Sequence, residues 1–264
     1  KNQVGNVLIR VGSGSNSNSA SLTSVKTVYA GSSSEADSLF RKIALNVQLI
    51  SQGSDSACTA SSCLLVTAAL PANTNTSFFG SGLGPTMDLT LALPTSFNSP
   101  DPLTPHTITA STVSGTLSVD GFNGILNLTG DSNKISVTHA LIFAGSCLQT
   151  MQGDITVGTG SIFDLARPSR LVPCSAGSSS SGTHPWFNVR SGRGNVEISL
   201  TAPSTNLLLD ANTNNGKISD DFNLNIPGTS DGSASYHGPL LAGSTPTASL
   251  YVFASTGNIG IHKQ

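Results

Sequence analysis

Residues 113–137 read VSGTLSVDGFNGILNLTGDSNKISV, and this stretch decides the predicted fold. It repeats one short pattern three times, a turn followed by apolar residues that alternate with Ser, Thr or Asn. Glycine and asparagine supply such turns because both tolerate positive φ. A period of two places the aliphatic side chains on one face of a strand and the polar ones on the other. The stretch therefore predicts short strands joined by tight turns at Ser114-Gly115, Asn123-Gly124 and Ser132-Asn133.

The same pattern returns along the C-terminal half of the chain. Its turns fall near positions 115, 133, 153, 194, 216 and 257, at intervals of about 20 residues or about twice that. A strand pattern of this period is typical of a stacked β-solenoid, in which each coil packs on the coils above and below it. The sequence thus predicts an all-β fold, a parallel β-helix-like solenoid of right-handed winding with about 20 residues per coil. The later copies are Gly153-Asp154-Ile155, Gly194-Asn195-Val196, Gly216-Lys217-Ile218 and Gly257-Asn258-Ile259.

The composition restricts both the architecture and the partners. The chain has 264 residues, of which 10% are charged, and a formal net charge of −2. An average globular protein carries about 25% charged residues, and nucleic-acid binding requires clustered Lys and Arg. The sequence therefore excludes a nucleic-acid footprint and argues against electrostatic binding to anionic lipid. Since no sharp boundary divides the chain, we predict one domain over residues 1–264, irregular in 1–112 and regular in 113–264.

The irregular N-terminal part contains further strands and one short helix. Ser33, with Glu35 soon after it, is typical of a helix N-terminus, and the charges and helix formers of residues 36–42 continue the helix. Two apolar runs flank a loop that contains a cysteine, which predicts a hairpin. The predicted strands are residues 4–11, 22–30, 43–50, 63–70 and 87–93.

Four cysteines indicate an oxidising compartment, where disulfides persist. Cys58 and Cys63 lie close together at the tip of the predicted hairpin, and Cys147 could pair with Cys174 if an insertion bulges between successive coils. Free buried thiols are an alternative, and a metal site is a weaker one because structural zinc favours two close pairs. The chain opens directly into strand-like residues, so we expect a signal or membrane anchor to precede Lys1.

The sequence contains no convincing catalytic motif, and we expect no catalytic residues, no cofactor and no metal site. The five histidines are scattered without metal-ligand spacing. Asp220 and Asp221 form the one adjacent acidic pair and are a candidate ligand or ion site. A glycosidase would need two carboxylates at a set separation, whereas neighbouring residues on a strand point to opposite faces. The pair therefore suits such an enzyme only if it lies in a turn.

The repeated pattern also resembles a known family. The copies that begin at Ser114, Gly153, Gly194 and Gly257 are similar to the S-G-D-I-x-V repeats of the bacterial putative-adhesin β-helix family, a domain of unknown function that is secreted or anchored to a membrane. The resemblance covers most of the chain. It implies a β-helix at the bacterial envelope or cell surface with an adhesive role, and it supplies no catalytic residues. The cysteines and a long Ser-rich insertion depart from the family pattern.

These observations favour a non-catalytic exported surface domain of a bacterium. Rows of Ser, Thr and Asn on the outer strand faces either solvate the sheet or bind a glycan, the cell wall or a protein through many weak hydrogen bonds. A polysaccharide-acting β-helix enzyme is the first alternative, and an envelope sensing or scaffolding domain is the second. A membrane would take part only through an anchor outside this chain.

Overall fold

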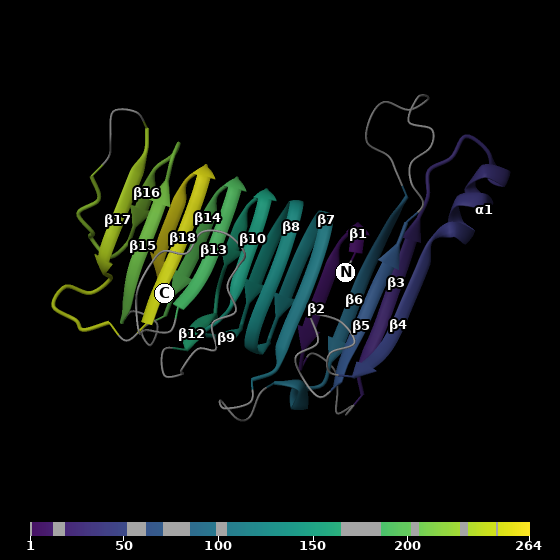
Figure 1. Cartoon of the computed structure of the whole chain (residues 1–264), viewed down its shortest axis with the longest axis horizontal. Coiled ribbons are helices and arrows are strands. Elements are labelled where there is room, and N and C mark those ends of the chain that lie inside the picture. The colour runs from purple at the N-terminus through teal and green to yellow at the C-terminus, as the bar shows by residue number, and fades with distance from the viewer. Residues whose placement is uncertain are drawn as a thin grey trace.

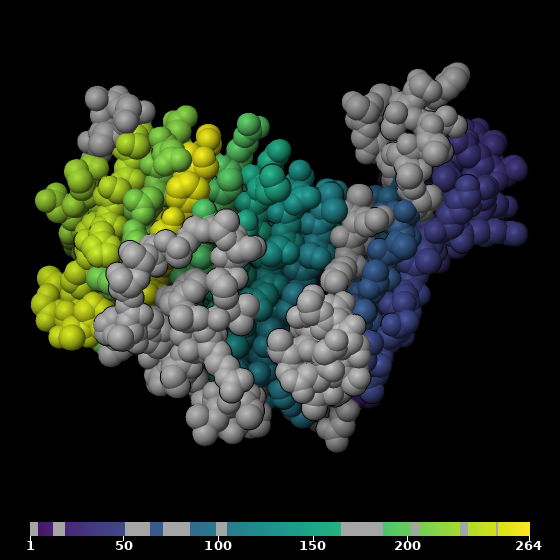
Figure 2. All heavy atoms as spheres, viewed as in Figure 1, coloured from purple at the N-terminus to yellow at the C-terminus, as the bar shows by residue number. Residues whose placement is uncertain are grey.

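The computed structural model describes residues 2–12, 19–51, 62–70, 85–98, 105–164, 186–201, 206–227, 232–246 and 248–264. In these residues a mixed sheet of 17 strands runs along the long axis of the molecule, with a separate two-stranded hairpin and one α-helix at one end (Figure 1). The space-filling view shows the same elongated outline, with α1 at one end and the strands β15–β17 at the other (Figure 2). The expected all-β class with a short N-terminal helix is confirmed.

The elements are β1 (Asn2–Val4), β2 (Val7–Val11), β3 (Ser21–Thr27), α1 (Ser33–Lys42), β4 (Ala44–Ser51), β5 (Ser62–Ala69), β6 (Thr86–Leu93), η1 (Thr95–Phe97), β7 (Thr107–Asp120), β8 (Asn123–Thr138), β9 (Leu141–Phe143), β10 (Cys147–Gln152), β11 (Ile155–Val157), β12 (Ile162–Asp164), β13 (Trp186–Arg193), β14 (Val196–Leu200), β15 (Leu207–Thr213), β16 (Ile218–Asp220), β17 (Ala234–Pro239), β18 (Ala248–Thr256) and β19 (Ile259–Lys263).

The N-terminal helix and hairpin form where the sequence predicts them. The Ser32 hydroxyl caps α1 by accepting a hydrogen bond from the Glu35 amide at 3.3 Å, and Glu35 accepts one from the Gly31 amide at 3.1 Å. Arg41 and Lys42 occupy the last turn, where positive charge favours a helix end. None of the α1 residues is buried, so the helix contributes no side chain to the buried core. β4 and β5 pair in antiparallel register as the expected hairpin.

The prediction of one continuous strand over residues 4–11 is wrong. The chain breaks it into β1 and β2 at Gly5, which has a φ of 125°. Gly5-Asn6-Val7 is a further copy of the glycine, Asn or Asp, aliphatic pattern. The break could therefore have been found in the sequence.

Successive copies of the pattern lie side by side in parallel register. Ile135 pairs with Ile155, twenty residues further along the chain, and Ile155 pairs with Val196. Val196 in turn pairs with Ile259. All four side chains have 0% exposure. Aliphatic side chains from distant parts of the sequence thus form one interior column.

Glycine at the turn allows these copies to approach each other. Gly153 has a φ of 141°, and a Cβ there would overlap the carbonyl oxygen of Asn133 in the neighbouring strand. Next to this turn, the buried Thr150 hydroxyl lies 2.9 Å from the Asn133 side-chain oxygen, and Ser191 donates to the Gly153 carbonyl at 2.9 Å. The close backbone contact and the buried hydroxyls together fix the path of the chain at this turn, which we call the corner.

Near both ends of the sheet, strands that are neighbours in space are not consecutive in the chain. β2 lies between β6 and β7 and is parallel to both. β18 and β19 lie between β13 and β14 on one side and β15 and β16 on the other. Figure 1 accordingly places both chain ends within the array of strands. Antiparallel strands, β3 on β6 and β17 on β15, flank the parallel rows.

One hydrophobic core runs through the described strands from Val7 to Ile261. A second, smaller cluster lies under the hairpin and contains Ile43, Ala68, Met87 and Leu89. In the part of the chain that the structure describes, no helix has the length and hydropathy that a membrane crossing requires.

Candidate functional site

A row of outward-facing side chains crosses successive strands of the sheet. On most of these strands the residues on either side are buried, so the side chains between them face outward. Ser136 pairs with Ser118 on one side and with Thr156 on the other, and the same register continues in both directions. We call this row and the row two residues further along the strands the polar face. The first row contains Thr90, Leu8, Ser118, Ser136, Thr156, Glu197, Gly260 and Ser219.

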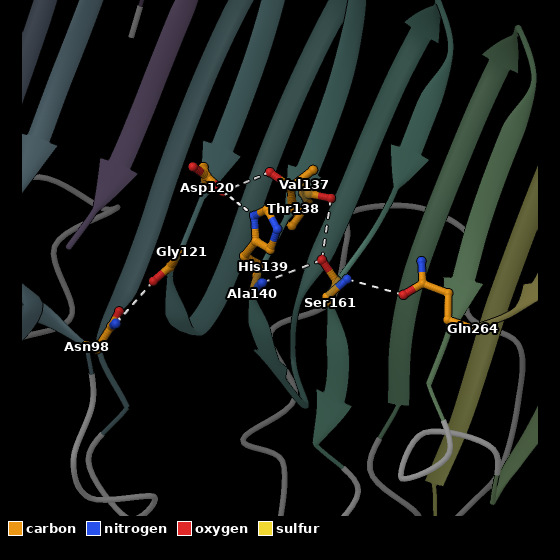
Figure 3. A network of polar contacts seen from close by, with 10 residues as sticks. Asn98, Asp120, Gly121, Val137, Thr138, His139, Ala140, Ser161 and Gln264 are labelled. Carbon is orange, nitrogen blue, oxygen red and sulfur yellow. Dashed lines mark hydrogen bonds and ion pairs between the residues drawn. The ribbon is translucent and has the colours of Figure 1, made fainter. Parts of the chain in front are cut away.

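The second row of the polar face contains a paired histidine and carboxylate. The Asp120 carboxylate accepts a hydrogen bond from the Thr138 hydroxyl at 3.0 Å and lies 2.8 Å from His139 Nδ1 (Figure 3). The hydrogen bond from His139 lowers the pKa of Asp120, with partial burial opposing it and Thr138 and Arg10 adding to it. This carboxylate is therefore ionised at neutral pH and already has its partners.

A larger charged group lies at the C-terminal end of the polar face. His262 Nε2 is 2.8 Å from Glu197 on β14, and His262 Nδ1 is 3.4 Å from Asp221, which follows β16. Gly260 makes the first contact possible, because a Cβ there would overlap the Glu197 carboxylate that lies across β19. One imidazole thus bridges three adjacent strands.

The charge state of His262 follows from this geometry. A neutral imidazole has one donor nitrogen, whereas the protonated ring can donate to both carboxylates. The hydrogen bond with Glu197 raises the pKa of His262, burial opposes the rise, and Asp221 adds to it. The group therefore favours an imidazolium held between two carboxylates.

The predicted acidic pair separates into two roles. The Asp220 carboxylate accepts from the backbone amides of Phe222 and Leu224 at 2.7 and 3.0 Å, which stabilises the turn after β16. Asp221 accepts from the Lys263 amide at 3.1 Å and faces His262. The two carboxylates therefore have different partners, and a ligand or ion site at this pair stays a prediction.

The cysteine predictions fall mostly on parts of the chain that are not described. Cys58 and Cys174 lie outside the described residues, as does the side chain of Cys63 on β5. Cys147 is buried on β10 with 6% exposure. No cysteine is free in the described part of the chain. The pairing of Cys147 with Cys174, and of Cys58 with Cys63, stays a prediction.

The Asp and Asn residues that follow the turn glycines have a structural role. Asp154 accepts from the Asn195 amide at 2.8 Å, and Asn195 accepts from the Asn258 amide at 2.8 Å. Each side chain thereby satisfies a backbone amide of the next strand. These hydrogen bonds join segments that are 41 and 63 residues apart in the sequence.

Sequence reasoning missed one group on the outward side of β13 and β18. The Arg190 guanidinium lies 5.9 Å from the ring centre of Tyr251 and 5.3 Å from that of Phe253. The two rings stack with a centroid separation of 6.5 Å and an interplanar angle of 6°. Burial raises the pKa of Tyr251. Tyr251 and Phe253 are two residues apart, a spacing that places both side chains on one face of a strand. Their alignment with Arg190 could not be predicted, because it requires the parallel register between β13 and β18.

Metal-binding chemistry has no obvious place here. Among the described residues, no three His, Cys, Asp or Glu side chains lie together so that they could hold a metal ion. In both histidine groups an imidazole contacts the carboxylates, which stay 39–53% exposed. The polar face thus carries a set of hydroxyl groups beside two histidine–carboxylate groups.

Comparison with known proteins adds little to this geometry. No family model and no curated protein matches the sequence. Among solved structures, the chain is similar to a putative cell adhesion protein from Clostridium sporogenes ATCC 15579, with 9% identity and a TM-score of 0.40. That likeness spans 100% of this chain and 93% of the other. A likeness this distant carries no argument about function.

Proposed function

We propose that this chain is a non-catalytic, adhesin-like domain exported to the surface of a bacterium, where the polar face binds a glycan, the cell wall or a protein. The observation that carries the proposal is the row from Thr90 to Ser219, which repeats outward positions at the spacing of adjacent strands, about 4.8 Å. Its Ser and Thr hydroxyls can both donate and accept hydrogen bonds. A polymer with repeating hydroxyl or amide groups can bind along such a row through many weak contacts.

We further propose that the stacked strands form a parallel β-helix-like solenoid with right-handed winding. The register supports it, because Ile135 and Ile155 pair at a separation of twenty residues and share one buried column. Stacking of this kind keeps the outward rows long and flat, which suits an extended ligand. The low charge of the chain, and the absence of a free cysteine among its described residues, support a place outside the cytoplasm.

The arrangement of the carboxylates favours binding over catalysis. A glycosidase places two carboxyl groups on either side of the bond that it cleaves. In this chain the space between Glu197 and Asp221 is occupied by the His262 ring, which contacts both. A substrate would have to displace that ring before it could lie between the two carboxylates.

A glycan array and a pull-down on purified bacterial cell walls test the proposal. The variant Ser136→Arg/Thr156→Arg places two bulky charges on adjacent strands in the middle of the polar face. The matched control Thr129→Arg/Gln149→Arg places the same charges at another registered pair, on β8 and β10. We expect the unchanged chain and the control to bind an array glycan or the cell wall, and the polar-face variant to lose at least about tenfold in affinity.

The same experiment separates the alternatives. Release of new reducing ends from a bound polysaccharide would favour the enzyme and contradict the non-catalytic proposal. Equal binding by both variants would show that the polar face is not the site. An absence of glycan and cell-wall binding, together with a stable complex with an envelope protein, would favour the scaffolding domain.

A further inference from the structure

The last 17 residues of the chain, Ala248–Gln264, occupy the interior of the array rather than its end. We call them the C-terminal segment. Its first strand, β18, is parallel to β13 on one side and to β15 on the other. Its second strand, β19, lies in the same way between β14 and β16. The segment therefore satisfies the hydrogen bonds of strands on both of its sides.

The described strand residues hold the segment by packing and hydrogen bonds along its whole length. Its inward side chains have 0% exposure, so removing them would open the core to water. At its end, His262 contacts Glu197 and Asp221, and the Gln264 amide donates to the Leu200 carbonyl at 2.9 Å. The Gln264 side chain accepts from the Gly160 amide at 3.2 Å (Figure 3). The buried side chains are Ala248, Leu250, Val252, Ala254, Ile259 and Ile261.

The connection between β17 and β18, which leads into the C-terminal segment, is exposed to solvent. β17 and β18 flank opposite sides of β15, so the connection between them must cross the end of that strand. Leu241 is 41% exposed, and Gly243 has a φ of 75° with open space where a Cβ would stand. The Leu240 amide donates to the Leu207 carbonyl at 3.0 Å and marks where the exposed part begins. A change of backbone direction at residues 241–246 would disturb none of the buried packing.

We propose that the C-terminal segment is exchangeable between copies of this chain, so that one copy fills the central position of another. The partner is a second copy of this chain. Only the same sequence reproduces the strand register and the side chains that fill the position between β13–β14 and β15–β16. Every contact of the segment with β13–β16 is the same whichever copy supplies it, and only the connection changes path. The inference goes beyond surface binding, since it concerns how copies assemble, and it does not require the proposed function.

A cysteine pair reports which copy supplies the segment. Arg193 on β13 and Thr256 on β18 are registered partners, and both are exposed. In the variant Arg193→Cys/Thr256→Cys, a self-inserted segment gives an intrachain disulfide, whereas exchange gives a covalent dimer. The full-length variant is unfolded in denaturant, refolded at low and at high concentration, oxidised, and run on a non-reducing gel. We expect the covalent dimer to increase several-fold at high concentration, with a folded circular dichroism spectrum. The single variants control for other disulfides.

Two further variants test the mechanism. His262→Gln weakens the end of the segment, whereas His139→Gln removes a histidine–carboxylate contact of the same 2.8 Å length outside it. We expect only His262→Gln to speed the exchange of segments between two native populations that differ in mass, measured as mixed dimers by native mass spectrometry. Deletion of residues 241–247 leaves Leu240 alone between β17 and β18, a reach of about 7 Å, whereas strands on opposite sides of β15 are about 9.6 Å apart. The deletion therefore prevents self-insertion and should turn folded monomer into folded dimer or larger species.

Clear results would overturn the inference. If the deletion in the connection between β17 and β18 still gives a folded monomer, the length of that connection does not limit insertion of the C-terminal segment into its own copy. Intrachain disulfide alone at every concentration, with the refolded protein native by circular dichroism, would show that copies do not exchange the segment. Equal acceleration by both histidine variants would mean that general destabilisation, and not release of the segment, causes the exchange.

Discussion

The turn glycines set how closely two strands can stack at the corner. A Cβ at Gly194 would overlap the carbonyl oxygen of Gly153, and a Cβ at Gly257 would overlap that of Gly194. The residues also need positive φ, which an L side chain rarely adopts. A single added methyl group therefore has to push two adjacent strands apart, and it does so beside buried hydroxyls whose hydrogen bonds depend on that spacing.

Gly194→Ala should destabilise the fold by about 3 kcal/mol or more, because it adds steric overlap to backbone strain. Gly243→Ala is the matched control, since it also has positive φ, at 75°, but its Cβ would meet open space. The control should cost about 1–2 kcal/mol. Urea unfolding followed by circular dichroism measures both. Equal losses would show that φ alone, and not the contact with Gly153, requires glycine.

Strands of the polar face are joined by side chains as well as by backbone hydrogen bonds. His262 on β19 reaches Glu197 on β14 and Asp221 beside β16. These strands come from three separate parts of the sequence. Because the imidazolium form satisfies both carboxylates, protonation should couple to the stability of these three elements.

The raised pKa of His262 fixes the sign of this coupling. A group whose folded pKa lies above its unfolded value, here 6.5, contributes stability that is fully present below that pH. The contribution is lost as the pH rises through the folded pKa. The difference in free energy of unfolding between the unchanged chain and His262→Gln should therefore shrink as the pH increases above 6.5.

Denaturant unfolding of both proteins across this pH range measures the difference. His106→Gln provides the control, since the His106 ring contacts the Phe97 carbonyl at 2.6 Å and lies far from β19 in sequence. A free-energy difference for His262→Gln that does not change with pH would contradict the proposed protonation of the bridge.

The fold of the whole molecule depends on pairing between strands that are far apart in the sequence. One core extends from Val7 to Ile261, and the last strands of the sequence lie between rows that are synthesised earlier. Such long-range pairing carries a large loop-closure cost before it contributes stability. The C-terminal half should therefore become fully ordered only when the C-terminal segment is in place.

Deletion of residues 248–264 should expose the facing edges of β13 and β15 and abolish cooperative unfolding of the C-terminal half. Replacement of α1 by a Gly-Ser linker of ten residues should leave the melting transition nearly unchanged, because no residue of the helix is buried. Hydrogen exchange at β13–β16 distinguishes the outcomes. Native protection of these strands in the shortened chain would contradict a central role for the segment.

Much of the local structure could be predicted because it depends on short-range chemistry. The helix start at Ser33, the hairpin and the strand over residues 87–93 each follow from a few neighbouring residues, although the capping side chain belongs to the preceding residue, Ser32. The polar face was predictable in kind, since alternation assigns Ser136 and Thr156 to an outer surface. Its charged group was not, because Glu197 and His262 are 65 residues apart and meet only through the strand register.

The sequence by itself determined the all-β class and which side of most strands faces the core, whereas two of the predicted turns, Ser114-Gly115 and Ser132-Asn133, are wrong because they lie inside the continuous strands β7 and β8. The class and the core-facing sides follow from a period of two, which acts within a few residues. Only the tertiary structure decided that β2 and the C-terminal segment insert between other rows, and that His262 bridges two carboxylates. The physical reason is that strand pairing is set by hydrogen bonds and packing between distant segments, and many orders of stacking satisfy the same local pattern.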